Sequence, residues 1–386
     1  MTDTRDSHPS PRPVRERLIA GAMSGTSADG VDVAVIALFG AGTELQIRLL
    51  RHHALPYSPD LRRRIISVRQ SGVTTLEDLA QIGREISLAY ATAVIEALAS
   101  LKLGGADLLC VGVHGQTLWH GPPSTIQWID PSLVAHEVGC PVISDFRRAD
   151  CAVGGQGAPL VPFADYAIFR HPHSLRAMVN IGGIANVTLL RPGGMLSETV
   201  AFDTGPGNCI SDYLMRRHDP AGPGFDRGGE MATNGLPEIE TAQRVLADPY
   251  FAALPPKSTD VPQMLALWER AYTMTEPRPI PDLLATACYI TASSILDGLY
   301  RTLGRMPDEL IVSGGGCRNA SIMGFLRATP GLVVRTTDDY GLPAEAKEAV
   351  AFAILAAATV DGIPANIPAV TGARRAVVLG SITPRP

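Results

Sequence analysis

The sequence predicts a two-lobed α/β protein, and three observations carry this prediction. Its 386 residues exceed what one hydrophobic core usually supports, so two domains with a cleft between them are expected. A strand, a glycine-containing turn and a second strand recur at the opening of each half, over residues 18–39 and 177–190. Strand-like and helix-like stretches alternate around these hairpins, which is typical of α/β layers.

The first half opens with a hairpin. Its apolar stretch is interrupted by the small-residue run MSGTSADG at residues 23–30, and the β-branched alternation VDVAVI follows. A helix is expected over residues 76–101 and a strand over residues 108–113. Turn-rich segments are expected at residues 114–123 and 145–162.

The second half repeats the hairpin around Gly182 and Gly183. A strand is expected to end at Phe202, followed by a turn over residues 203–208 and a helix from near Cys209. The last elements expected are a strand at residues 309–312, the turn SGGGCRN, a helix to about residue 328, and a long helix from Pro343 to just before Gly362.

These elements predict three parts of the chain. Residues 1–17 are charged and proline-containing and are expected to form a disordered tail. Residues 18–178 are expected to form lobe I, with the first hairpin and part of the substrate site. Residues 179–386 are expected to form lobe II, with the second hairpin, and their C-terminal segment is expected to pack back on lobe I.

Composition excludes several functional classes. The formal net charge of −5 gives no reason to expect nucleic acid as a partner. The longest apolar run, residues 350–360, is too short to cross a bilayer, and the N-terminus does not resemble a secretory signal. Six scattered cysteines without a C-x-x-C pair are typical of reduced thiols, so a cytoplasmic protein without a membrane span is expected.

The glycine-rich turns indicate phosphate binding. Main-chain N–H groups can converge on a phosphate at such turns, because no Cβ blocks close approach. Each turn alone is weak evidence, but the order hairpin, hairpin, strand-GGG-helix is more specific. A P-loop is excluded, because none of the three lysines, Lys102, Lys257 and Lys347, follows a glycine. A dinucleotide-binding fold lacks its fingerprint, because no G-x-G-x-x-G follows a strand.

Two carboxylates, Asp29 and Asp32, occur at the first turn. Carboxylates among phosphate oxygens repel them unless a cation intervenes, which favours Mg²⁺ held by Asp29. Asp29 is equally well explained as a residue that caps the turn. Both interpretations remain open.

Seven sequence blocks together resemble the anhydro-N-acetylmuramic acid kinases, a family of the actin/hexokinase/Hsp70 superfamily. They occur in the family's order through most of the chain. The blocks are GAMSGTSADGVD (21–32), HGQT (114–117), SDFRR (144–148), GGQGAPL (154–160), NIGGIAN (180–186), FDTGPGN (202–208) and SGGG (313–316).

The resemblance implies two actin-like, ribonuclease H-like lobes with an ATP and sugar cleft between them. It implies a cytoplasmic kinase that uses ATP, Mg²⁺ and water to open 1,6-anhydro-N-acetylmuramic acid and phosphorylate O6, in peptidoglycan recycling. The products would be N-acetylmuramic acid 6-phosphate and ADP. No nucleic acid or membrane partner is implied, and the family tendency favours a homodimer.

The resemblance also implies the site residues. Asp203 would be the catalytic base that deprotonates water, and Glu348 a second carboxylate near the sugar. The substrate-binding residues would be Gln116, Asp145 and Arg147, the last or its neighbour Arg148 binding the lactyl carboxylate. The nucleotide-binding residues would be Gly25, Thr26, Ser27, Ala28, Asp29, Gly30, Val31, Asp32, Asn180, Gly182, Gly183, Gly205, Gly207, Asn208, Gly314, Gly315, Gly316 and Asn319.

Structural explanations exist for several of these residues. Asp203 could stabilise a turn, and Glu348 could interact with the dipole of its helix. Arg147 and Arg148 could be surface arginines. His114 and His120 are assigned no role, because phosphoryl transfer needs neither.

One segment departs from the family pattern. After PPKST at residues 255–259 the family continues with Gly-Arg-Glu, whereas Asp260, Val261 and Pro262 follow here. The departure is expected to affect a local loop, or a domain or subunit contact, and not the phosphate turns. A second hypothesis is an actin-like ATPase that serves as a chaperone or filament protein without sugar chemistry.

Overall fold

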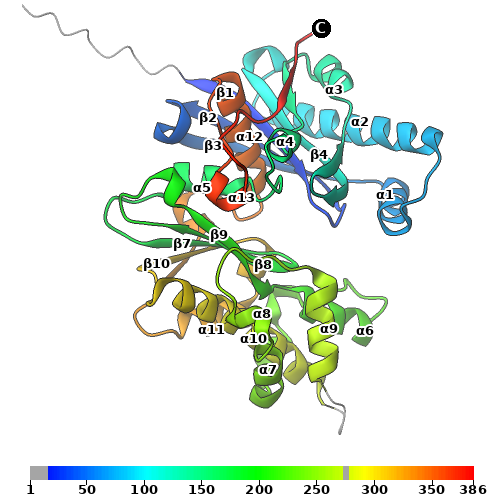
Figure 1. Cartoon of the computed structure of the whole chain (residues 1–386). Helices are drawn as coiled ribbons and strands as arrows, with labels where there is room; N and C mark the ends of the chain where they lie inside the picture. Colours follow the sequence, from blue (N-terminus) through cyan, green and yellow to red (C-terminus); the bar gives the residue numbers. More distant parts are fainter. Residues whose placement is uncertain (1–15, 273–277) are drawn as a thin grey trace, which may run out of the picture.

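The chain folds into two α/β lobes stacked one above the other (Figure 1). The computed structural model describes residues 16–272 and 278–386. The tail expected over residues 1–17 lies outside the described residues up to residue 15, and Arg17 already begins the first strand. The α/β fold class expected from the sequence is confirmed.

Lobe I is built on a seven-stranded sheet with the order β12-β6-β4-β1-β2-β3, and β5 pairs with β4. Its strands are β1 (Arg17–Ser24), β2 (Gly30–Phe39), β3 (Gln46–Pro56), β4 (Cys110–Gly121), β5 (Ser124–Trp128), β6 (Val142–Ser144) and β12 (Ser381–Thr383). Its helices are α1 (Pro59–Ser71), α2 (Leu76–Ser100), α3 (Pro131–Val138), α4 (Arg148–Ala152), α5 (Val161–Phe169), α12 (Lys347–Val360) and α13 (Pro368–Thr371).

Lobe II is built on a five-stranded sheet with the order β11-β10-β7-β8-β9. Its strands are β7 (Arg176–Ile181), β8 (Ile184–Leu190), β9 (Val200–Pro206), β10 (Glu309–Ser313) and β11 (Val333–Thr336). Its helices are α6 (Cys209–His218), α7 (Ile239–Leu246), α8 (Pro249–Ala252), α9 (Val261–Ala271), α10 (Ile280–Leu303) and α11 (Ala320–Arg327).

The two sheets share one topology. In each, three antiparallel strands are followed by a parallel strand beside the first of them, β4 beside β1 and β10 beside β7. A further parallel strand extends each sheet, β6 in lobe I and β11 in lobe II. The two predicted hairpins, β1–β2 and β7–β8, are therefore confirmed and occupy equivalent places.

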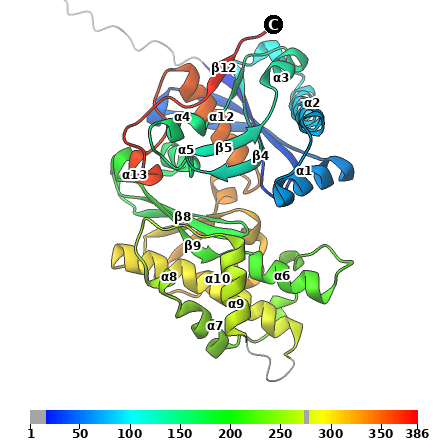
Figure 2. The same ribbon diagram turned by 45° about the vertical axis from the view of Figure 1, so that its right-hand side comes forward.

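The end of the chain packs on lobe I. Helix α12 contacts β1, β2 and β4, and its alanine-rich sequence is buried on nearly all sides. The buried carboxylate of Asp150 accepts hydrogen bonds from Asn366 Nδ2 and Thr371 Oγ1, both at 2.7 Å. Figure 2 shows α12 in the upper lobe and α13 at the lower edge of that lobe, where α13 also contacts β9 of lobe II.

Four details of the expected elements were wrong. Strand β4 covers residues 114–121 of the predicted turn segment at 114–123, because pairing with β5 outweighs the turn preference of its glycines. Strand β9 likewise continues to Pro206, because residues 200–206 pair with β8. Short helices α4 and α5 occupy parts of the predicted turn segment at 145–162. Helix α12 begins at Lys347, because Pro343 and Ala346 close a separate turn through a 2.9 Å hydrogen bond.

Helix α10 is the longest helix of lobe II. It is long and apolar enough, by length and composition alone, to cross a membrane. However, 67% of its most apolar window is buried inside the protein, as expected of the central helix of a folded lobe. We therefore describe α10 as the core helix of lobe II.

Candidate active site

A cleft of about 620 Å³ lies between the lobes. The β4–β5 hairpin, α5 and the start of α12 line it from lobe I, and the β7–β8–β9 sheet lines it from lobe II. Its ionisable lining residues are His120, Arg147, Asp165, Asp203, Lys257, Lys347 and Glu348. Three carboxylic acids and three strong bases thus share one cavity, which suits a polar substrate.

A row of polar residues crosses the lobe II sheet on its cleft side. Asn180 pairs with Asn186 across β7–β8, and Asn186 pairs with Asp203 across β8–β9. Directly opposite residues in a sheet project from the same face, and all three line the cleft. Strand register therefore places the predicted base Asp203 beside the amide of Asn186, in one row with that of Asn180.

Asp203 is held by hydrogen bonds to its side chain and from its main chain. Its Oδ2 accepts a hydrogen bond from the N–H of Thr259 at 3.0 Å, and its own N–H donates to the carbonyl of Lys257 at 3.1 Å. Burial raises the pKa of the Asp203 carboxyl, and the Thr259 N–H and the Lys257 ammonium partly offset this rise. The carboxyl is thus closer to the working range of a general base than an exposed aspartate.

Glu348 faces the same cleft from lobe I, in the first turn of α12. Burial raises its pKa, whereas the Lys347 ammonium and the Arg147 guanidinium act in the opposite direction. Lys347 forms a buried ion pair with Asp165, with Nζ and Oδ1 2.9 Å apart. The structure therefore brings Asp203 and Glu348 together across one cavity, each beside a cation.

Arg147 is the one predicted substrate-binding residue that lines the cleft. Its Nε donates to His114 Nε2 at 3.0 Å, and its Nη1 donates to the carbonyl of Gly157 at 2.8 Å. Burial lowers the pKa of His114, so its ring is neutral and can accept this bond. Arg147 is a fixed guanidinium in the cleft, as recognition of a carboxylate requires.

Gln116 and Asp145, the other two predicted substrate residues, do not line this cleft. The Gln116 amide accepts from Ser24 Oγ at 2.8 Å and donates to the carbonyl of Gly25 at 3.0 Å. Asp145 pairs with Arg148, with Oδ1 and Nε 2.7 Å apart. Gln116 therefore supports the first hairpin turn, and a substrate contact for either residue stays a prediction.

The second hairpin turn meets the Gly314–Gly316 segment and the start of α6. A Cβ on Gly207 would lie 2.2 Å from the carbonyl oxygen of Gly182, and one on Gly316 would lie 2.2 Å from Ile181 Cγ2. Only glycine permits these approaches. The N–H groups of Gly183, Gly315 and Gly316 have no acceptor among the described residues, so they remain able to bind an anion.

The same segments hold the other predicted nucleotide residues of lobe II. Asn208 Nδ2 donates to the carbonyl of Ile181 at 3.4 Å, which ties α6 to the second turn. Asn319 caps α11 by accepting from the N–H groups of Ser321 and Ile322. Gly205 packs against α8 and α10, since a Cβ there would lie 2.7 Å from Phe251. These contacts explain Gly205 and Asn319 without a nucleotide.

The first hairpin turn is more exposed and charged. The N–H groups of Thr26 and Ser27 have no acceptor in the described part of the chain, and both residues are exposed. Asp29 pairs with Arg62, with Oδ1 and Nη2 2.9 Å apart, and Asp32 contacts His52 Nε2 at 3.1 Å. The remaining predicted positions of this turn can bind a ligand through the backbone only, because two are glycines and two have buried side chains. They are Gly25, Ala28, Gly30 and Val31.

The divergent segment at residues 260–262 begins helix α9 beside the second turn. Asp260 caps this helix by accepting from the N–H of Gln263 at 2.8 Å. Val261 Cγ2 lies 3.5 Å from where a Cβ on Gly183 would stand. The expectation that this departure does not touch the phosphate turns was therefore wrong.

The polar cleft residues missed from the sequence include Asp165, Asn186, Lys257 and Lys347. Two of the chain's three lysines thus line the cleft, and their rarity was the available signal. Asn186 could have been found from its spacing to Asn180, because the turn at Gly182 and Gly183 makes the two strands antiparallel.

The chain is similar to known proteins over nearly its whole length. The family model described as "Anhydro-N-acetylmuramic acid kinase" matches residues 17–385. The anhydro-N-acetylmuramic acid kinase of Gloeobacter violaceus is 38% identical over 381 residues, covering 95% of this chain and 98% of that protein. The one of Pasteurella multocida is 38% identical over 371 residues, covering 95% and 96%. A solved structure, the ADPNP-bound activator of the 2-hydroxyisocaproyl-CoA dehydratase from Clostridium difficile, is 13% identical, with a TM-score of 0.45 and coverage of 89% and 96%.

Proposed function

The chain belongs to the anhydro-N-acetylmuramic acid kinase family, and from this membership we propose how its cleft carries out the family's reaction. The protein is a phosphotransferase with an alcohol acceptor and a small-molecule substrate. ATP is implied by the family. The observation that supports the proposal is that Asp203 of lobe II and Glu348 of lobe I face one cavity.

Asp203 acts as the general base. Its carboxylate takes a proton from water as the water oxygen attacks the anomeric carbon of 1,6-anhydro-N-acetylmuramic acid. The bond from that carbon to O6 breaks, and O6 takes the γ-phosphoryl group of ATP in line, which gives N-acetylmuramic acid 6-phosphate and ADP. Glu348 lies near the sugar, and Arg147 binds the lactyl carboxylate.

The phosphates of ATP bind at the glycine turns. The free N–H groups of Gly183, Gly315 and Gly316 face them from lobe II, and those of Thr26 and Ser27 from lobe I. Within residues 16–272 and 278–386, no three His, Cys, Asp or Glu side chains form a metal cluster. Asp29 would hold Mg²⁺, because this ion commonly uses one or two carboxylates with phosphates and water. When bound, the ion would offset phosphate charge.

The test follows ADP release by purified protein in Mg-ATP, with and without the anhydro sugar. We expect turnover that depends on the sugar, with one N-acetylmuramic acid 6-phosphate formed per ADP. ADP release at the same rate without sugar would contradict the proposal and support the ATPase alternative.

Three further properties are proposed from the family and composition. We expect a cytoplasmic enzyme that takes part in peptidoglycan recycling, a homodimer, and no nucleic acid or membrane partner. Light scattering of the purified protein tests the dimer, and cell fractionation tests the location.

A further inference from the structure

Helix α1 places two arginines against the first hairpin turn. Arg62 pairs with Asp29 of the turn, and the guanidinium of Arg69 donates to the carbonyl of Thr26. Ser58 caps the start of this helix by accepting from the N–H of Leu61 at 3.2 Å, and Gly72 ends it in a left-handed conformation. The arginines therefore come from a well-defined helix and not from a loop.

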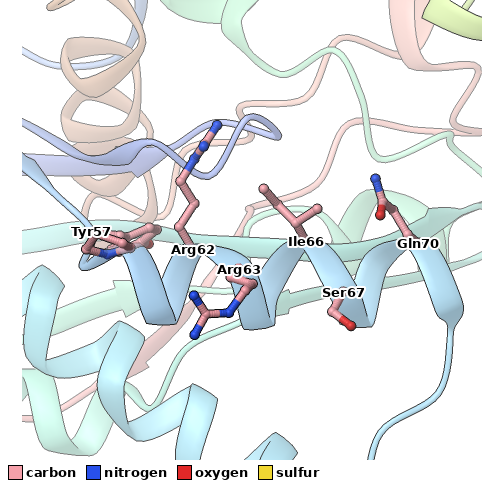
Figure 3. Close-up of a pocket in the computed structure, with 7 residues that line it drawn as sticks. Tyr57, Arg62, Arg63, Ile66, Ser67 and Gln70 are labelled. Atoms are coloured by element: carbon pink, nitrogen blue, oxygen red, sulfur yellow. The ribbon is translucent and has the colours of Figure 1, made fainter. Parts of the chain in front are cut away.

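Neighbouring arginines of α1 differ in direction. Figure 3 shows Arg62 extending toward the β1–β2 turn, whereas Arg63 points away from it. Arg63 pairs with Asp60 of its own helix, and Arg64 pairs with Glu85 of α2 at 2.6 Å. Arg62 is thus the α1 arginine whose acidic partner belongs to the turn itself.

A polyanion at the turn requires positive charge in addition to the Mg²⁺ proposed at Asp29, and the guanidinium of Arg69 already donates to the carbonyl of Thr26. The turn's N–H groups at Thr26 and Ser27 are free, but the carboxylate of Asp29 beside them repels phosphate oxygens. Two of the chain's three lysines lie in the sugar cleft, and Lys102 follows α2. Arg62 also lines a surface hollow of about 530 Å³ along the exposed face of α1, together with Arg63, Ile66 and Gln70.

We propose that Arg62 is a phosphate-binding residue of the nucleotide site, and that its guanidinium exchanges Asp29 for the terminal phosphates of a nucleoside triphosphate. The inference rests on the proposed function, because it assumes that ATP binds at the first turn. The side chains of Arg62 and Asp29 are 47% and 69% exposed. Because an exposed ion pair contributes little to stability, Arg62 can readily exchange Asp29 for another anion. A guanidinium matches phosphate oxygens in two-pronged geometry.

The test measures the affinities of ATP, ADP and AMP by isothermal titration calorimetry for the wild type, Arg62→Gln and the matched control Arg63→Gln. We expect Arg62→Gln to weaken ATP binding by about 10-fold or more and AMP binding by less than about 2-fold, because AMP lacks the terminal phosphates. Arg63→Gln should change neither by more than about 2-fold, because an exposed pair within one helix contributes little. Arg62→Lys should fall between wild type and Arg62→Gln, since it keeps the charge but loses the fork.

Two results would overturn the inference. Equal ATP affinities of Arg62→Gln and Arg63→Gln would show that Arg62 does not bind phosphate. Equal weakening of ATP and AMP would show that Arg62 only shapes the turn; Arg62→Lys provides the same comparison if Arg62→Gln does not fold. Failure of the proposed function is distinguishable, because the wild type itself would then bind no ATP or show no sugar-dependent turnover.

Discussion

The two hairpin turns occupy equivalent places in the two lobes but present different chemistry. The first turn, between β1 and β2, carries Asp29 and is tied to α1 through Arg62. The second turn, between β7 and β8, consists of Gly182 and Gly183, packed against Gly207 by a close backbone approach. One turn combines side-chain charge with free N–H groups, and the other relies on main chain alone.

This difference shows how one topology serves two tasks. Side chains can exchange partners, so the first turn suits a ligand that arrives and leaves. The second turn is closely packed and lies beside the row that ends at Asp203, so it suits holding one geometry during the reaction. Substitutions in lobe II should therefore affect catalysis and folding, whereas substitutions at the first turn should affect affinity.

The largest effect is expected at Asp203. Asp203→Asn keeps the side chain's shape but cannot accept the water's proton, so we expect kcat to fall by about 100-fold or more. ATP affinity should stay within about 2-fold, because the substitution leaves the glycine turns intact. Steady-state kinetics and calorimetry measure the two quantities. A kcat within a few fold of wild type would reject Asp203 as the base.

The next effect is on the free energy of unfolding, and it should differ between the two turns because they are packed differently. Gly207→Ala would place its Cβ 2.2 Å from the carbonyl oxygen of Gly182, and we expect it to lower the free energy of unfolding by about 1–3 kcal/mol. Gly25→Ala is the matched control, because its Cβ would come no closer than 3.7 Å to a neighbour, Ser27 Oγ. Urea unfolding measures both variants. Equal unfolding free energies would contradict the contrast between a packed and an open turn.

The smallest effect is a shift in pH dependence. Asp203 is active when ionised, and burial raises its pKa, so kcat should fall on acidification at a higher pH than an ordinary aspartate would give. The Lys257 ammonium lowers that pKa, so Lys257→Met should move the acidic limb of the pH profile upward, by up to about one pH unit.

Lys102→Met is the control for this shift, because Lys102 is exposed and lies outside the cleft lining. Its profile should match that of the wild type. A uniform loss of kcat in Lys257→Met, with the acidic limb unmoved, would indicate that Lys257 only supports the loop after α8 and does not act on Asp203.

The sequence was sufficient for the two hairpins and for selecting two carboxylates, Asp203 and Glu348, that line one cleft, because both depend on local pattern and on long motifs. It was insufficient where partners distant in sequence decide. Residues 114–121 look like a turn until β5 pairs with them, and Gln116 looks like a cleft residue until Ser24 and Gly25 take up its amide. The position of Lys347 in the cleft depends on its ion-pair partner, Asp165, which is 182 residues earlier in the sequence.

That buried ion pair also bears on how the lobes move. The chain passes to lobe II after α5 ends at Phe169, and it returns before α12 begins at Lys347. The Asp165–Lys347 ion pair thus joins the helices of lobe I, α5 and α12, that flank the two linkers to lobe II. We therefore expect any movement of the lobes to bend these two linkers while the Asp165–Lys347 ion pair stays intact.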